Sequence, residues 1–280
     1  MESTRVGVAP TWQQVSLDGR VLWDAVRQAS SYSDVSILGI AQGSDLTFVA
    51  LNGANLVISW RFCLPGSTDG SFVFLVPPMI VSHLLTALPQ TEGAVDLALN
   101  GNEASLAARD GVGRYELRWR FDLHGFPAPP GMNQLLVLPS TLVRLGYLDF
   151  ADSIHQAVAR LGAIESRHPV HRTKLAISIG LVDGQLMVEG QEIGRQATGV
   201  HYFDPRLLIR ALECVRAGQV DVGLSQLDSE RGYLSLVDRR PDFVMHCALL
   251  SISLNMPWLP PLPPGRKQHG RIRQASLWNL

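Results

Sequence analysis

The sequence has few of the residues that make covalent cross-links or strong electrostatic fields. It contains 3 cysteines in 280 residues, and none of them has CxxC spacing. Cys63, Cys214 and Cys247 therefore predict buried, reduced thiols, and neither a disulfide framework nor a cysteine metal site. The formal net charge of -1 excludes a general electrostatic attraction to nucleic acid. Any DNA binding would need a locally basic face.

Long apolar runs are also missing from the sequence. No run approaches the length that a membrane-spanning helix needs. The first residues show no basic region followed by an apolar core, which a secretory signal would have. The expectation is a cytoplasmic protein without a membrane partner.

Motifs for catalysis or cofactor binding are absent as well. The 8 histidines are scattered, and His168 and His171 lack further ligands at a recognisable spacing. The glycines at 111–113 stand between two expected strands, which predicts a hairpin turn and not a phosphate-binding loop. We expect no enzyme, no metal and no cofactor. Chemistry would need residues that come together from distant positions, which a sequence does not reveal.

An internal repeat organises the chain. An apolar strand at 72–76 precedes a helix expected at about 79–88, and Pro78 suits the first turn of that helix. Alternating strands are expected at 95–99 and 115–119. The same order returns about 125 residues later. Its members are a strand at 201–203, a helical stripe at 207–215, and strands at 219–224, 233–237 and 243–247.

Each half also has an earlier amphipathic helix. Asp18 is a good N-cap for a helix at 19–30, and a longer helix is expected at about 148–161. Further strands are predicted between turn signals, at 35–40, 46–51, 56–62, 135–138, 174–181 and 185–188. The predicted fold class is α+β, with two repeated domains that each pack two helices on antiparallel sheets.

The domain boundaries follow from composition. Residues 1–126 form the first predicted domain, and the proline- and glycine-rich segment 127–133 is the linker. The second predicted domain covers 134–253. Residues 254–280 form a proline-rich, basic tail that has too few core residues to fold alone.

The order of these motifs resembles a domain of the bacterial DNA sliding clamp, the β subunit of the replicative polymerase. The resemblance covers most of residues 12–253, and it rests on motif order and on the repeat. Its matching points in the first half are Phe74-Leu75-Val76-Pro77, Leu84 to Pro89, Val95-Asp96-Leu97, Tyr115-Glu116-Leu117 and Gly125-Phe126-Pro127. Those in the second half are Phe203-Asp204, Leu207-Leu208, Val220-Asp221-Val222 and Phe243-Val244-Met245.

The resemblance implies that double-stranded DNA passes through a ring lined by the helices and is bound without base readout. Binding of this kind needs long, positively charged side chains that contact the phosphates without fixed geometry. The candidates on the outward helix faces are Arg20, Arg27, Arg160, Arg206, Arg210 and Arg216. Asp24 and Glu213 dilute the positive charge of these faces. The alternative for each arginine is an ordinary solvated helix face.

Two departures from the clamp pattern bear on assembly and partners. Bacterial clamps close as dimers of three-domain chains, whereas this chain has room for two domains, so a six-domain ring implies a homo-trimer with head-to-tail interfaces. Leu249-Leu250-Ser251-Ile252 ends the last expected strand where the clamp has its final Met-Pro pair, so the peptide groove is expected only at substitute positions. These positions are Gly190, Ile193, Leu250 and Ile252.

The last residues resemble the clamp-binding peptide of clamp partners. The pattern consists of Gln274, Leu277, Trp278 and Leu280. Two functions remain open. One is a nucleoid-associated processivity factor that encircles DNA and tethers polymerase, clamp loader or repair proteins. The other is a clamp-derived adaptor that does not encircle DNA and binds a true clamp through this tail.

Overall fold

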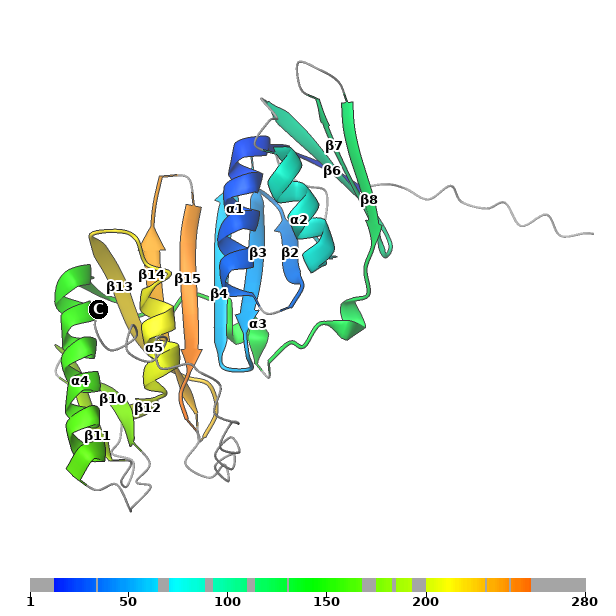
Figure 1. Cartoon of the computed structure of the whole chain (residues 1–280). Coiled ribbons are helices and arrows are strands. Elements are labelled where there is room, and N and C mark those ends of the chain that lie inside the picture. Colours follow the sequence, from blue (N-terminus) through cyan, green and yellow to red (C-terminus); the bar gives the residue numbers. More distant parts are fainter. Residues whose placement is uncertain are drawn as a thin grey trace, which may run out of the picture.

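Antiparallel sheets and a row of helices make up the computed structural model (Figure 1). The structure describes residues 13–33, 35–64, 71–88, 93–109, 114–129, 131–167, 175–182, 185–192, 200–229, 231–241 and 243–252. The helices α1, α2, α4 and α5 lie on the side of the sheets that faces the viewer (Figure 1). No helix in these ranges is long and apolar enough to cross a membrane.

The first half alternates three strand groups with two helices. Its elements are β1 (Gln13–Asp18), α1 (Gly19–Tyr32), β2 (Ile37–Gln42), β3 (Asp45–Asn52), β4 (Leu56–Cys63), β5 (Ser71–Val76), α2 (Pro78–Ala87), β6 (Ala94–Asn100), β7 (Glu103–Arg109) and β8 (Arg114–Arg120). The Asp18 carboxylate starts α1 by accepting hydrogen bonds from the backbone N–H groups of Arg20 and Val21, at 2.9 and 3.0 Å. Pro78 occupies the first turn of α2, as expected.

The second half repeats this order after a connector. The connector contains the 3-10 turn η2 (Leu123–Gly125) and the short helix α3 (Met132–Leu135). Then follow β9 (Val143–Gly146), α4 (Tyr147–Arg167), β10 (Leu175–Val182), β11 (Gln185–Glu192), β12 (Val200–Phe203), α5 (Pro205–Leu212), β13 (Gln219–Gln226), β14 (Gly232–Arg239) and β15 (Phe243–Leu250).

One large sheet joins the two halves. Its eight strands run in the order β5-β2-β3-β4-β15-β14-β13-β9, and the junction is the antiparallel pair of β4 and β15. In this pair Phe62 lies opposite Phe243, and Leu56 lies opposite Leu249. The halves therefore share a hydrogen-bonded ladder and not only a flexible linker.

Each half contributes one further sheet, and the two differ in size. The sheet of the first half has four strands in the order β1-β6-β7-β8, and that of the second half has three described strands in the order β11-β10-β12. By the repeat, β11 corresponds to β3, and no strand in the described ranges takes the place of β4. Residues 193–199, between β11 and β12, lie outside these ranges.

The core forms where the helices press on the sheets. On α1, Leu22, Ala25, Val26 and Ala29 are buried at helical spacing, as the sequence predicts. Phe48 and Trp60 are among the largest fully buried side chains of the sheet beneath this helix. Because this apolar stripe is buried against the sheet, the opposite face of α1 is exposed to solvent.

The connector covers the other face of the large sheet. Tyr233 and Asp238 point to opposite faces of β14 because they are an odd number of residues apart. Asp238 accepts a hydrogen bond from the backbone N–H of Arg216, just after α5, at 3.0 Å. The Tyr233 hydroxyl instead donates to the Gln134 carbonyl of α3, at 3.5 Å. Leu135 of α3 is 1% exposed, so this part of the connector is packed down.

The prediction of a strand at 135–138 is wrong. Leu135 is instead the last residue of the short helix α3. Gly131 is the N-cap of this helix, and its φ of 74° lies in the left-handed region that favours glycine. A short apolar run does not by itself distinguish a buried strand from a buried helical turn. The strands β7 and β9 were not predicted from the sequence. The helices α1 and α4 run beyond their expected ends, to Tyr32 and Arg167.

A candidate nucleic-acid interface

Two exposed stripes, one from each half, carry most of the predicted DNA-binding arginines. On α1 the stripe is Arg20, Asp24 and Arg27, at spacings of four and three residues. On α5 it is Arg206, Arg210 and Glu213, at the same spacings. Residues at these spacings lie on one helix face. Each stripe therefore presents two arginines and one acid on the side opposite the buried residues.

The stripe on α1 is braced by an aromatic ring. The Arg27 guanidinium lies 3.3 Å from Asp24 Oδ1 and 4.7 Å from the centre of the Trp23 ring. The Trp23 indole N–H donates to the Leu85 carbonyl of α2, at 3.2 Å. The ring is thus held between the helices, and the cation is held over the ring.

The stripe on α5 has the same construction. The Arg210 guanidinium lies 2.8 Å from Glu213 Oε2 and 5.6 Å from the centre of the Tyr32 ring. This carboxylate contact raises the pKa of Arg210 above its usual value. Asp204 caps α5 by accepting from the backbone N–H groups of Arg206 and Leu207, as Asp18 does for α1.

Tyr32 links the two stripes across the junction of the halves. It is the last residue of α1, and its hydroxyl donates to the Glu213 carbonyl at the end of α5, at 2.9 Å. Burial raises the pKa of Tyr32 to about 12, so this hydroxyl keeps its proton at neutral pH. Arg210 from one half therefore rests on a ring that the other half supplies.

We call this surface the arginine seam, and it consists of the exposed residues Arg20, Arg27, Arg206, Arg210 and Arg216. The Arg216 guanidinium lies beside the Tyr32 hydroxyl and lowers the pKa of that group, against the larger effect of burial. Within the described part of the chain, Arg20 and Arg206 have no ion-pair partner. The seam includes five of the six arginines that the sequence predicts for DNA binding, and α1 and α5 meet at their C-terminal ends.

The outer helices α4 and α2 present less positive charge than α1 and α5. Arg160 is exposed on α4, and the exposed residues Asp149 and Asp152 precede it on the same helix. On α2 the exposed polar residues include Ser82, His83 and Thr86. In the described ranges, positive charge is therefore concentrated at the centre of the row, where α1 and α5 meet.

Of the predicted peptide-groove residues in the described ranges, Gly190 lies on β11, Leu250 ends β15 and Ile252 follows β15. Gly190 lies on β11 beneath α4, where an added Cβ would collide with the Ala157 carbonyl oxygen. Leu250 is 4% exposed on β15, and Ile252 donates its backbone N–H to the Tyr202 carbonyl of β12. Ile193 lies outside the described residues. The groove stays a prediction, and Gly190 has a packing role that accounts for it better.

The predicted clamp-binding tail also lies outside the described residues. This applies to Gln274, Leu277, Trp278 and Leu280. Its role stays a prediction that rests on the sequence.

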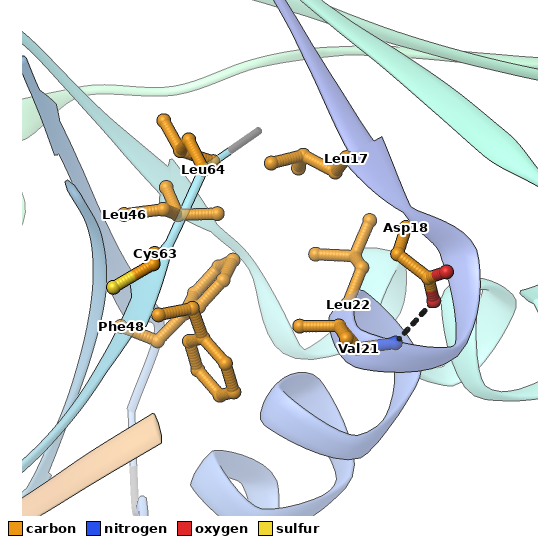
Figure 2. A pocket seen from close by; sticks show the side chains of 9 residues that line it. Leu17, Asp18, Val21, Leu22, Leu46, Phe48, Cys63 and Leu64 are labelled. Carbon is orange, nitrogen blue, oxygen red and sulfur yellow. Dashed lines mark hydrogen bonds between the residues drawn. The ribbon is translucent and has the colours of Figure 1, made fainter. Parts of the chain in front are cut away.

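An apolar pocket that the sequence did not reveal opens at the start of α1 (Figure 2). Its volume is about 400 Å³. The lining residues come from the β1–α1 junction and from the neighbouring ends of β3 and β4 (Figure 2). They are Leu17, Asp18, Val21, Leu22, Leu46, Phe48, Phe62, Cys63 and Leu64. Asp18, its one carboxylate, is already engaged in capping α1, so the pocket favours apolar groups and contains no catalytic pair.

Buried histidines do not form a reactive site. Burial lowers the pKa of His246 to about 4 and also lowers that of His201. His246 Nε2 lies 2.9 Å from Ser235 Oγ within the large sheet, where both side chains are buried. Among the described residues, no group of three His, Cys, Asp or Glu side chains is arranged to hold a metal ion.

Comparison with solved structures decides the fold. No protein-family model matches the sequence, and no curated protein matches it. Crystal structures of the DNA polymerase III β subunit, however, superpose on about 90% of the chain. The fold is that of a bacterial DNA sliding clamp.

Three sliding-clamp structures show the extent of the similarity. The β subunit from Pseudomonas aeruginosa has a TM-score of 0.57 and 14% identity, over 90% of this chain and 69% of that one. The β chain from Streptococcus pneumoniae has a TM-score of 0.56 and 14% identity, over 90% and 67%. The sliding clamp from Bacillus subtilis has a TM-score of 0.54 and 12% identity, over 90% and 68%.

These comparisons confirm the predicted fold class and the predicted resemblance. The chain spans about two thirds of each clamp, which agrees with two clamp-like units in place of the three that the resemblance gives for bacterial clamps. The sequence identities establish the fold alone. What the arginine seam binds is therefore argued from this chain's own residues.

Proposed function

We propose that the chain is a sliding-clamp-like processivity factor that encircles double-stranded DNA and tethers polymerase, clamp loader or repair proteins at the nucleoid. The observation that carries this proposal is the arginine seam, because it places cations from both halves on the helix side of a clamp fold. Such a surface suits phosphates and reads no bases. The function requires binding and assembly but no chemistry.

Ring closure is supported by two strand edges at opposite ends of the molecule. Figure 1 shows β8 and β11 at these ends, and each is an edge strand of its described sheet. An edge strand offers unpaired backbone groups to another chain. The exposed side chain of Arg120 on β8 complements the exposed Glu189 on β11, while Arg118 is already paired with Glu116 at 2.7 Å. Head-to-tail pairing of β8 with β11 of the next copy would thus be favourable.

The number of copies follows from the number of units. If the ring has six clamp-like domains, two domains per chain give a trimer. Light scattering across a concentration series tests this assembly. We expect a stable species near three times the chain mass of 30.7 kDa. A monomer at every concentration would contradict the ring.

A second function is favoured by one specific observation. The tail sequence, with Gln274, Leu277, Trp278 and Leu280, resembles the peptide by which clamp partners bind a clamp. This resemblance favours a clamp-derived adaptor that does not encircle DNA. Such an adaptor would be a monomer and would bind a separate clamp only while Gln274 and Leu277 are intact.

A further inference from the structure

Both helices of the seam carry an acid that contacts a seam arginine on the same helix. Asp24 contacts Arg27 and Glu213 contacts Arg210, in each case with a three-residue offset. The side chains of the first pair are 37% and 50% exposed, and those of the second are 46% and 45% exposed. Both pairs lie at the surface, within reach of a ligand on the seam.

The two arginines have aromatic support that does not depend on the acids. Arg27 lies over Trp23, which α2 holds, and Arg210 lies over Tyr32, which α5 holds. If a guanidinium left its carboxylate, the ring would still keep it near its present position. Each acid is therefore unnecessary for placing its arginine, and it lowers the positive charge of the seam.

We propose that Asp24 and Glu213 compete with DNA phosphates for Arg27 and Arg210, and thereby keep the grip of the seam on DNA weak. This inference rests on the proposed function, since it assumes that the seam faces the duplex. Arginine binds phosphate and carboxylate through the same two-pronged geometry, so the two anions compete for one site. Exposed ion pairs of this kind are weak and exchange readily.

Weak, exchangeable contacts suit a surface that slides. A phosphate that leaves an arginine during sliding is replaced by the neighbouring carboxylate, so the cation is never left without a partner. Arg20 and Arg206, which lack ion-pair partners in the described part of the chain, then supply the constant attraction. The acids set how tightly the duplex is held.

The test removes both acids and keeps the arginines. Asp24→Asn/Glu213→Gln is compared with the wild-type full-length chain for binding to a fluorescent duplex, by anisotropy across a salt series. We expect affinity to rise about 2- to 30-fold at low salt, from the release of two exposed ion pairs. The slope of log affinity against log salt should steepen by up to about 2, because two more phosphates are neutralised per chain.

Two variants control for net charge. Asp152→Asn removes one negative charge from the exposed face of α4, where no ion pair is described, and should change affinity less per charge. Glu103→Gln changes β7, away from the helix row, and should leave affinity unchanged. Circular dichroism confirms that each variant is folded.

A double-mutant cycle separates competition from general electrostatics. In an Arg27→Gln/Arg210→Gln background, removing Asp24 and Glu213 should have little effect, because no arginine remains to be released. The same gain in both backgrounds, or no gain in the wild-type background, would overturn the inference and leave the proposed function standing. Absence of DNA binding by both the wild type and the acid-free variant at low salt would overturn both.

Discussion

Replacing Gly190 with alanine tests the packing of α4 on the second half. An added Cβ would collide with the Ala157 carbonyl oxygen and lie 2.9 Å from its carbonyl carbon and 3.0 Å from Leu161 Cγ. The obstacle is mainly helix backbone, which a rotamer change does not move. Either α4 or β11 must shift, and overpacking of this kind costs about 1–3 kcal/mol.

The assay is urea denaturation, with Gly162→Ala as the matched control. Gly162 lies on α4, and an added Cβ there meets nothing within 4 Å. Alanine at this position should stabilise the helix by about 0.5–1 kcal/mol. The two glycine-to-alanine changes should therefore move the free energy of unfolding in opposite directions. Unchanged stability of Gly190→Ala would refute the packing account and return Gly190 to the predicted peptide groove.

Three further predictions concern the seam and the buried groups. Replacing Arg20, Arg27, Arg206 and Arg210 together with glutamine should weaken duplex binding and flatten its salt dependence; unchanged anisotropy curves would count against the seam. Tyr32→Phe should lower the free energy of unfolding by about 0.5–1.5 kcal/mol, because the hydrogen bond to the Glu213 carbonyl is lost; equal urea midpoints would argue against that contact. His246 has a folded pKa of about 4, below its usual value, so the unfolded state binds the proton first. Stability should be full above about pH 6.5 and fall by up to ~1.4 kcal/mol per pH unit toward pH 4, and His246→Gln should reduce this dependence; identical pH profiles would contradict it.

Local signals predicted the parts of the fold that depend on neighbouring residues. The Asp18 cap and the apolar spacing of α1 are readable in the sequence, because both act within a few residues. The helix α3 was missed since its position depends on Gly131 and on burial of Leu135 against distant strands. The strand β9 has four residues, too few for a clear alternating pattern.

The candidate site was also predictable only where it depends on residues that are close in sequence. Three- and four-residue spacings placed Arg20, Arg27, Arg206 and Arg210 on exposed helix faces, as the structure has them. Arg216 was also expected on a helix face, but it lies beyond the end of α5 at Leu212. The rings of Trp23 and Tyr32 could not be foreseen as their supports, because Tyr32 and Arg210 meet only across the junction of the halves. Gly190 has two interpretations, because a glycine required for close helix packing looks, in sequence, like one that lines a groove.

Encirclement of DNA is the central claim, and retention on circular DNA tests it most directly. The chain is assembled on a nicked circular plasmid, washed at raised salt, and measured again after a restriction enzyme has linearised the plasmid. A closed ring held by topology should stay on the circle and slide off the linear ends. Equal loss from circular and linear DNA would mean that only ordinary electrostatic binding holds the chain, and the ring would be contradicted.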